Sequence, residues 1–457
     1  MEEKDYTSTH SQLREWVLDR VDTWEEHRNS NYLSKWDEYY RLWRGTWSEE
    51  DRNRSSEKSQ LISPATSQAI EATVAELEEA IFGTGIGKVI VQDKMEIVAN
   101  EVPVPGTMAT TTEVQEIPYV CVKLESVSPK EFVIDPTATS ISESLGVAHI
   151  VVKPRYLIEK GMKDGIYEDM ALGSFEKADC VYDDEFDTVS YEDDKVKIVE
   201  YWGLVPKRFL NKNASVDSFN YDDDELVEAV VTIANDDCVL RADENPFLLN
   251  DRPFISYQND RVPSKFWGRG IAEKGFNPQK ALDAELRARI DALALTTHPM
   301  MGLDATRLPR GTKFDIRPGK TILTNGDPKS VLMPLNFGSL SQSTFTEAAE
   351  LERMVQMGTG AMDSATSQSA QPRNGTASGM SMLQAASIKR QKRTLLNFQD
   401  SFLIPLINKT LYRRIQFDNQ RYPAGDFKFK PYSSLGIMAK ELETTQMVQL
   451  LSMTPQG

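Results

Sequence analysis

The sequence has few of the residues that compact catalytic or metal sites use. Its 457 residues include three cysteines and four histidines: Cys121, Cys180, Cys238, His10, His27, His149 and His298. The cysteines are odd in number and far apart, which excludes a disulfide framework and fits a reducing compartment. So few histidines leave little room for a His-based metal site or a catalytic triad. We therefore expect no metal and no cofactor.

Long apolar runs are also missing. No stretch approaches the ~20 apolar residues that a membrane-spanning helix requires. The first residues, Met1 to Asp5, are polar and acidic and do not have the pattern of a secretory signal. We expect an intracellular chain without a membrane partner.

Positive charge is scarce. The chain has 52 Lys and Arg against 69 Asp and Glu, a net charge of −17. Such a balance argues against a protein that coats nucleic acid, because neutralising phosphates needs clustered cations. One basic cluster stands out, Lys389, Arg390, Lys392 and Arg393. Two further arginines, Arg413 and Arg414, follow later in the same predicted helix. It is open to two interpretations, contact with phosphates or, the favoured one, pairing with the abundant acidic residues.

Motifs of common enzymes are missing as well. The glycines at Gly83-Thr-Gly85-Ile-Gly87-Lys88 do not have the spacing of a phosphate-binding P-loop. Gly268-Arg-Gly270 does not continue as a dinucleotide fingerprint, because position 273 is Glu. The Asp-rich stretches 181–194 and 217–227 are expected to be solvated loops, because consecutive carboxylates point in different directions. We expect no enzyme.

Helical periodicity dominates the N-terminal part. Apolar residues at i, i+3 and i+4 predict a helix over residues 10–45, and Ser63-Pro64 begins a second one that ends at Gly83. An aromatic stripe on the first helix either stacks on bases or, as we favour, packs against other elements. Its members are Tyr32, Trp36, Tyr39, Tyr40 and Trp43.

Short β runs follow between residues 86 and 240, bounded by Pro, Gly, Asp or Ser. A helix over Tyr156–Met162 interrupts them. The expected strands include Lys88–Gln92, Tyr119–Leu124, Phe132–Ile134, His149–Lys153 and Lys195–Trp202. The chain is therefore of the α+β class.

The C-terminal half is again helical. A helix over Asn277–Thr296 and another over Ser343–Met357, broken at Gly358 and Gly360, flank a compact block over 299–338 with short β runs. A polar loop, 363–379, leads into a helix over Met380–Phe417. We expect that helix to bend near Pro405, with its buried side formed by Leu403, Leu406 and Leu411.

The helix over 277–296 has an apolar stripe with little sequence nearby to cover it. The stripe consists of Leu282, Leu286, Ile290 and Leu293. We expect a neighbouring subunit to cover its first two-thirds. Amphipathic helices that the rest of the chain does not cover pack well in a ring, where the same heterologous contact repeats between neighbouring subunits.

Several segments together resemble the portal, or head-to-tail connector, proteins of tailed phages, especially short-tailed ones. Ser128–Pro136 is similar to the family's wing segment, and Phe266–Glu273 with Asn277–Asp283 to the start of its first stem helix. Asn374–Met380 is similar to the end of its tunnel loop. The resemblance covers most of the chain and rests on the order and spacing of these segments.

The resemblance implies a portal-like α+β subunit in a ring of about twelve. Its expected parts are a helical and β-rich wing (1–263), a first stem helix region (264–297), a small α/β clip (298–340), a second stem helix (341–358), a tunnel loop (359–379), a long kinked wing helix (380–417) and a wing return with the start of a crown (418–457).

The same resemblance implies the function. The ring would be the DNA conduit at one capsid vertex, for genome packaging, retention and ejection, in the virion and, during assembly, in the host cytoplasm. Partners would be other copies, double-stranded DNA bound without sequence preference, terminase, a tail adaptor and the major capsid protein. Arg373 and Asn374 of the tunnel loop would touch phosphates. The alternative is a non-conducting tail or baseplate adaptor.

Two places depart from the family pattern. Phe82 runs directly into the strand near Lys88, where family members carry many more residues, so we expect a break or a joined numbering there. Residues 442–453 look like the beginning of a helical region that is cut short.

Overall fold

The computed structural model contains two compact units that alternate along the chain. The first comprises Met1–Asp37, Glu76–Gly270 and Ala370–Gly457, and the second Glu38–Ala75 and Ile271–Ser369. Both helices and strands are abundant, as the α+β prediction requires. The structure describes residues 2–47, 61–73, 81–103, 110–173, 195–210, 225–258, 260–297, 300–303, 332–335, 342–359, 396–419, 421–423, 425 and 427.

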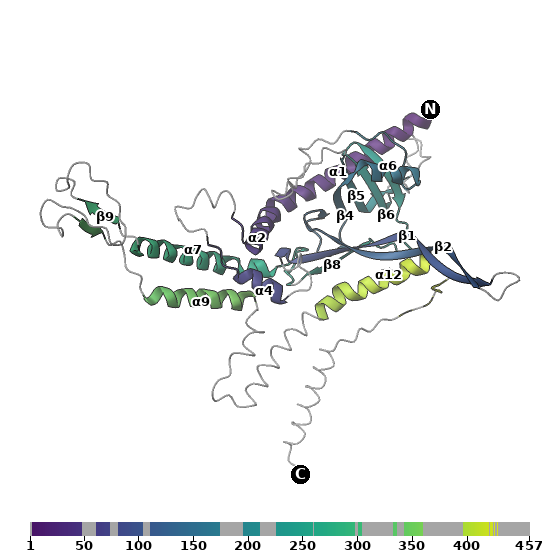
Figure 1. Cartoon of the computed structure of the whole chain (residues 1–457). Helices are drawn as coiled ribbons and strands as arrows, with labels where there is room; N and C mark the ends of the chain where they lie inside the picture. The colour runs from purple at the N-terminus through teal and green to yellow at the C-terminus, as the bar shows by residue number, and fades with distance from the viewer. Residues whose placement is uncertain are drawn as a thin grey trace, which may run out of the picture. The chain divides into compact units, whose positions relative to one another are not determined.

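A five-stranded antiparallel sheet forms the centre of the first unit (Figure 1). Its strands are β3 (Phe132–Ile134), β4 (Gly146–Pro154), β5 (Lys195–Pro206), β6 (Leu226–Ala234) and β7 (Cys238–Glu244), and neighbours in the sheet are neighbours in sequence. Helix α6 (Arg155–Lys163) follows β4, and a single 3-10 turn (Lys207–Phe209) follows β5. The predicted helix over Tyr156–Met162 and the strands predicted within β3, β4 and β5 are confirmed.

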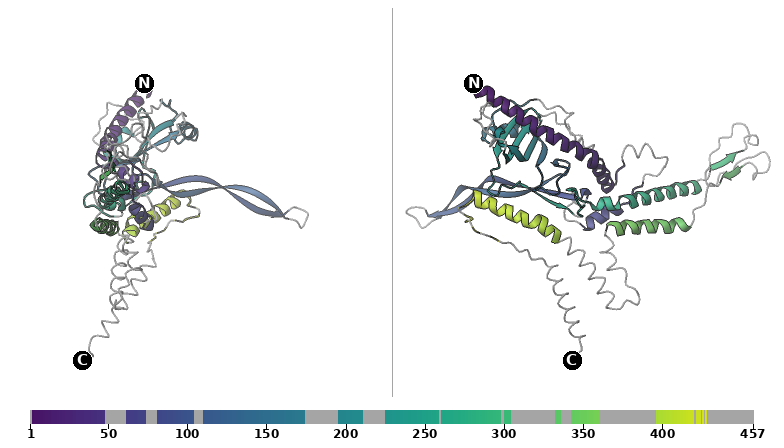
Figure 2. Two further views of the ribbon diagram at one scale, coloured as in Figure 1. Left: turned by 60° about the vertical axis from the view of Figure 1, so that its left-hand side comes forward. Right: turned by 180° about the vertical axis from the view of Figure 1, so that it is seen from behind.

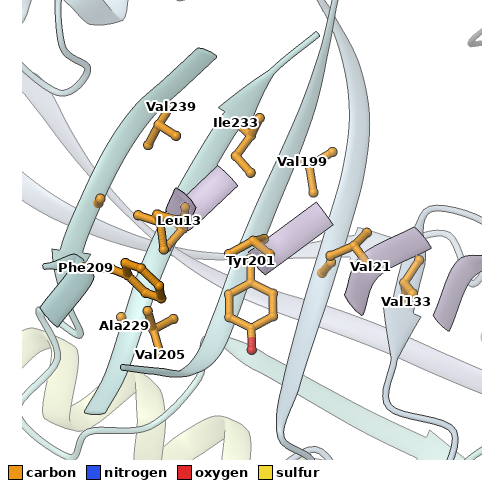
Figure 3. Close-up of a cluster of buried hydrophobic side chains, with 14 of the residues drawn as sticks. Leu13, Val21, Val133, Val199, Tyr201, Val205, Phe209, Ala229, Ile233 and Val239 are labelled. Carbon is orange, nitrogen blue, oxygen red and sulfur yellow. The ribbon is translucent and has the colours of Figure 1, made fainter. Parts of the chain in front are cut away.

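Helix α1 (Glu2–Arg28) covers one face of this sheet. Leu13, Val17 and Val21 are fully or almost fully buried against it, and Figure 3 shows Leu13 and Val21 beside Tyr201. Helix α6 covers the other face, where Ile158 packs with alternate residues of the same strands. This arrangement follows from the alternation of side chains along a strand.

The helix predicted over residues 10–45 is confirmed, with one local change. A π-helical turn (Asn29–Leu33) separates α1 from α2 (Ser34–Arg44). Trp36 is buried, and its ring centroid lies 4.8 Å from that of Trp267 and 5.8 Å from that of Phe82. Packing, and not base stacking, therefore explains this part of the aromatic stripe.

A second, three-stranded sheet has the order β2-β1-β8. Strands β1 (Thr84–Pro103) and β2 (Thr110–Val127) form a long ribbon, and β8 (Phe254–Gln258) pairs only with the first residues of β1. The expected break between Phe82 and Lys88 is wrong. The chain turns at Gly83, where φ is +87°, and enters β1 directly because glycine adopts this conformation without strain.

The described part of the helix predicted over 380–417 begins at residue 396. A π-helical turn (η6, Gln399–Leu403) leads directly into α12 (Ile404–Phe417), whose second residue is Pro405. The hydrogen-bonding pattern changes from π-type to α-type at this point, and the bend expected near Pro405 stays a prediction. Of the expected buried side, Leu406 packs against the cluster that contains Val89 and Phe402. Leu403 and Leu411 are only half-buried, whereas Phe402 and Arg413 are buried.

Among the residues that the structure describes, the second unit contains α4 (Ala65–Thr73), α7 (Ile271–Thr297), α9 (Gln342–Thr359) and the part of α2 from Glu38 onward. Two short antiparallel strands, β9 (Met300–Leu303) and β10 (Leu332–Leu335), lie between α7 and α9 in sequence. Both long helices were predicted, although α7 begins six residues earlier and has Pro278 inside it. The break expected at Gly358 is wrong, because α9 continues to Thr359.

Candidate functional site

Helices α7 and α9 form a hairpin, and they lie side by side in Figure 1. At its base three helices meet around Gly275. A Cβ atom at Gly275 would lie 2.8 Å from Thr66 Oγ1 and 3.0 Å from Thr359 Cγ2. A side chain there would have to displace these threonine side chains, so the start of α7, the end of α9 and α4 are in close contact.

Buried polar contacts attach the segment before α4 to α7. Gln279 is fully buried; its Oε1 accepts from the backbone N–H of Thr66 at 2.9 Å, and its Nε2 donates to the carbonyl of Ser63. The N–H of Ser63 donates to Asp283 Oδ1 at 2.7 Å. Burial raises the pKa of Asp283, although this hydrogen bond and Arg287 oppose the shift. These bonds satisfy backbone groups at the start of a helix, as capping side chains do.

The apolar core of the hairpin is short. Leu282 is 4% exposed and packs with Ala348 and Val355, while Leu286 and Leu351 lie at its edge. The prediction that a neighbouring subunit covers Leu282 is therefore wrong, because α9 of the same chain covers it. Leu286 is half-buried.

Further along α7 the same stripe is uncovered. Ile290 is 41% exposed and Leu293 is 45% exposed. On α9, Met354 and Met357 are exposed too, at 53% and 62%. Methionine adapts its shape readily and is common at interaction surfaces. The hairpin thus presents apolar side chains at its surface that its own core does not use.

Charged side chains of α7 are engaged within the same unit. The Arg287 guanidinium lies 4.6 Å from the centroid of the Trp47 ring, and Arg289 lies 3.6 Å from Glu285 one turn earlier. Both contacts keep the cations along the helix surface. The hairpin therefore offers a partner an exposed apolar set, Ile290, Leu293, Met354 and Met357, next to exposed charged residues of α9.

The candidate DNA contacts lie outside the described residues: Arg373, Asn374, Lys389, Arg390, Lys392 and Arg393. Two other cations of the basic region are described. Arg413 pairs with Asp251 at 2.9 Å, and Arg414 donates to the Tyr422 hydroxyl. For Arg413 the favoured interpretation, pairing with an acidic residue, is confirmed.

No group of three or more His, Cys, Asp or Glu side chains suited to a metal ion occurs among the residues that the structure describes. Within the same ranges, no helix is long and apolar enough to cross a membrane.

Sequence reasoning missed the length of the β1–β2 ribbon. It ended the first strand at Gln92 and began the second at Tyr119, whereas pairing continues to Pro103 and Thr110. A partial signal was present, because apolar runs recur at Val89–Val91 and Ile97–Ala99. Glu96, Asn100 and Glu113 lower the β-propensity of these stretches and obscured it.

Comparison with known proteins identifies the family. No curated protein matches the chain. A protein-family model described as "Phage SU10 portal protein" matches residues 42–422. The matched range covers most of the chain. It includes the α7–α9 hairpin, the β1–β2 ribbon and α12. This chain belongs to the phage SU10 portal protein family.

Proposed function

We propose that this chain forms a ring of about twelve subunits at one capsid vertex, through which double-stranded DNA passes without sequence preference. The uncovered apolar side chains of the α7–α9 hairpin, in a chain of a portal family, carry this proposal. In a closed ring the same heterologous contact repeats around an axis. It covers such a surface in every subunit, because a ring has no terminal subunit whose surface stays uncovered.

In this proposal the ring serves genome packaging, retention and ejection. Terminase and a tail adaptor dock on the clip (298–340), and the major capsid protein surrounds the wing (1–263). The stem consists of 264–297 and 341–358, the tunnel loop of 359–379, the long wing helix of 380–417, and 418–457 leads to a crown. The protein belongs to the virion vertex and assembles in the host cytoplasm.

The net charge of −17 supports passage of DNA and not its capture. Each phosphate held by a Lys or Arg adds to affinity through counterion release. A largely acidic tunnel keeps DNA free to move in both directions, with Arg373 and Asn374 as local contacts. The protein itself is not an enzyme in this proposal, so a separate motor supplies the energy of packaging.

Electron microscopy of the purified chain tests the assembly. We expect rings with a central opening wide enough for duplex DNA. Folded monomers at all concentrations would contradict the proposal, and closed discs without an opening would favour the non-conducting adaptor. In particles, replacing Arg373 with Ala and shortening 366–371 should leave packaging normal and retention poor. Normal retention in both variants would remove the loop from the mechanism.

A further inference from the structure

The β1–β2 ribbon has two different faces. In an antiparallel pair, residues directly opposite one another lie on the same face. One face therefore carries Val89 with Leu124 and Val91 with Val122, and the other carries Lys88 with Glu125. We name the first the Val91 face and the second the Lys88 face.

At its base the ribbon is covered on both faces. On the Val91 face, Val89 and Val122 pack with Phe402 and Leu406, which belong to η6 and α12. On the Lys88 face, Lys88 Nζ lies 2.6 Å from Glu200 of the five-stranded sheet. The base is thus a central layer between a helix and a sheet.

The helical cover ends before the ribbon does. Helix α12 ends at Phe417, where a groove of about 440 Å³ is lined by Phe417 and Asp418 from the helix end and by Asp93 and Val120 from the ribbon. Phe417 is 44% exposed and Met95 is 65% exposed. Figures 1 and 2 show the two strands continuing beyond α12. From Met95 to Pro103 this outer part spans roughly 27 Å at ~3.4 Å per residue.

On the Val91 face the pair Asp93–Val120 interrupts the apolar pattern, which resumes at Met95. By register this face carries three further pairs, Met95–Pro118, Ile97–Glu116 and Ala99–Val114, in which only Glu116 is polar. On the Lys88 face each corresponding pair contains a polar residue: Glu96–Ile117, Val98–Gln115 and Asn100–Glu113. Two-stranded ribbons are marginally stable alone, and apolar faces without cover mark interaction surfaces.

We propose that the Val91 face of the outer ribbon docks on a neighbouring copy of the same chain, and that α6 of that copy seats against it. The proposal rests on the proposed function, because the ring places a neighbour beside every subunit. A ribbon that docks on the next subunit makes a heterologous contact, and contacts of this kind repeat around an axis and close a ring.

Helix α6 has the complementary chemistry. Tyr156 is 67% exposed and Leu157 is 42% exposed, and Lys160 and Lys163 on the same helix are exposed. The one acidic residue within the helix, Glu159, is engaged by Arg155 at 3.2 Å. The groove beside Met95 carries the opposite charge, from Asp93, Asp418 and the carbonyl end of α12.

The dimensions also agree. Nine residues of α6 are roughly 13 Å long at ~1.5 Å per residue. The apolar stretch from Met95 to Ala99 is about 14 Å long at ~3.4 Å per residue. The length of α6 thus matches the length of the strand from Met95 to Ala99.

Photo-cross-linking of assembled rings tests the contact. With p-benzoylphenylalanine at position 95, we expect a covalent dimer whose linked peptide maps to residues 155–166. Absence of a dimer, a cross-link to another virion protein, or a dimer linked elsewhere would overturn the proposal. Rings without the cross-link defeat this inference alone, whereas a wild-type chain without rings defeats the proposed function and this inference with it.

A matched pair of variants gives a second measurement. Met95→Lys and Gln92→Lys each add one positive charge at an exposed ribbon position, on the Val91 face and the Lys88 face respectively. We expect Met95→Lys to lower the ring fraction several-fold in mass photometry and Gln92→Lys to leave it unchanged. Circular dichroism checks that both monomers are folded. Equal ring fractions for both variants would contradict the assigned face.

Discussion

Arg413 of α12 is fully buried, and its Nη2 lies 2.9 Å from Oδ1 of Asp251 in the loop before β8. The other carboxylate oxygen of Asp251 lies 2.9 Å from Lys409. The Arg413 guanidinium also lies 3.3 Å from the centroid of the Phe247 ring, which stacks on Trp202 of β5. Ionic and aromatic contacts therefore hold the end of α12 to the five-stranded sheet within the first unit.

Removing Arg413 should destabilise the first unit. Arg413→Met keeps much of the volume but leaves Asp251 with one cation, and breaking a buried pair costs about 3 kcal/mol. Urea unfolding followed by tryptophan fluorescence measures the loss. The control is Arg241→Met, whose partner Asp243 is half exposed, with an expected cost under about 1 kcal/mol. Equal losses would mean that the buried pair adds no special stability.

Glu200 should make the first unit sensitive to acid. Burial alone would raise the pKa of its carboxyl group, but Lys88 at 2.6 Å and a hydrogen bond from Trp202 reverse this and lower the pKa below 4.5. A lowered pKa contributes stability that is fully present above the unfolded-state value and is lost as pH falls through the folded-state value. Wild type should therefore exceed Glu200→Gln by a constant amount above about pH 5, and the difference should shrink below about pH 4.5. A difference that grew in acid would contradict this assignment.

The buried and the exposed parts of the apolar stripe of α7 should have different roles, monomer stability and ring assembly. Leu282→Ala removes a buried side chain and should cost about 3 kcal/mol of monomer stability. Ile290→Glu with Leu293→Glu changes exposed positions, so monomer stability should stay within about 0.5 kcal/mol. The double variant should nevertheless form few rings in mass photometry. Normal ring formation by it would show that these side chains lie outside the subunit contact.

Gly83 should tolerate no side chain. Its φ is +87°, and an added Cβ would lie 2.4 Å from the carbonyl oxygen of Gly268. Gly83→Ala should therefore cost about 3 kcal/mol or more, the sum of a backbone strain of about 1–2 kcal/mol and a backbone clash. The control is Gly165→Ala, where φ is +74° but no atom lies within 4 Å, so only the strain applies. Thermal unfolding of both variants measures the difference.

Local pattern was enough to predict many elements. The five short β runs lie within β1 to β5, and the helices around Ile158, Leu282 and Val355 occur where periodicity placed them. Pro405 lies in the first turn of α12, directly after the π-helical turn. Each of these depends on the spacing of apolar residues or on backbone restrictions, which the sequence states directly.

By itself, the sequence determined the class of the fold, the positions of its main elements and the family to which the chain belongs. Only the tertiary structure decided which apolar positions are covered. It buried Leu282 under α9 and left Ile290 exposed, paired Arg413 with Asp251, and ended α12 before the ribbon ends. The physical reason is that periodicity shows which side of an element is apolar, whereas cover and ion pairs join residues far apart in the chain, whose meeting depends on the whole fold.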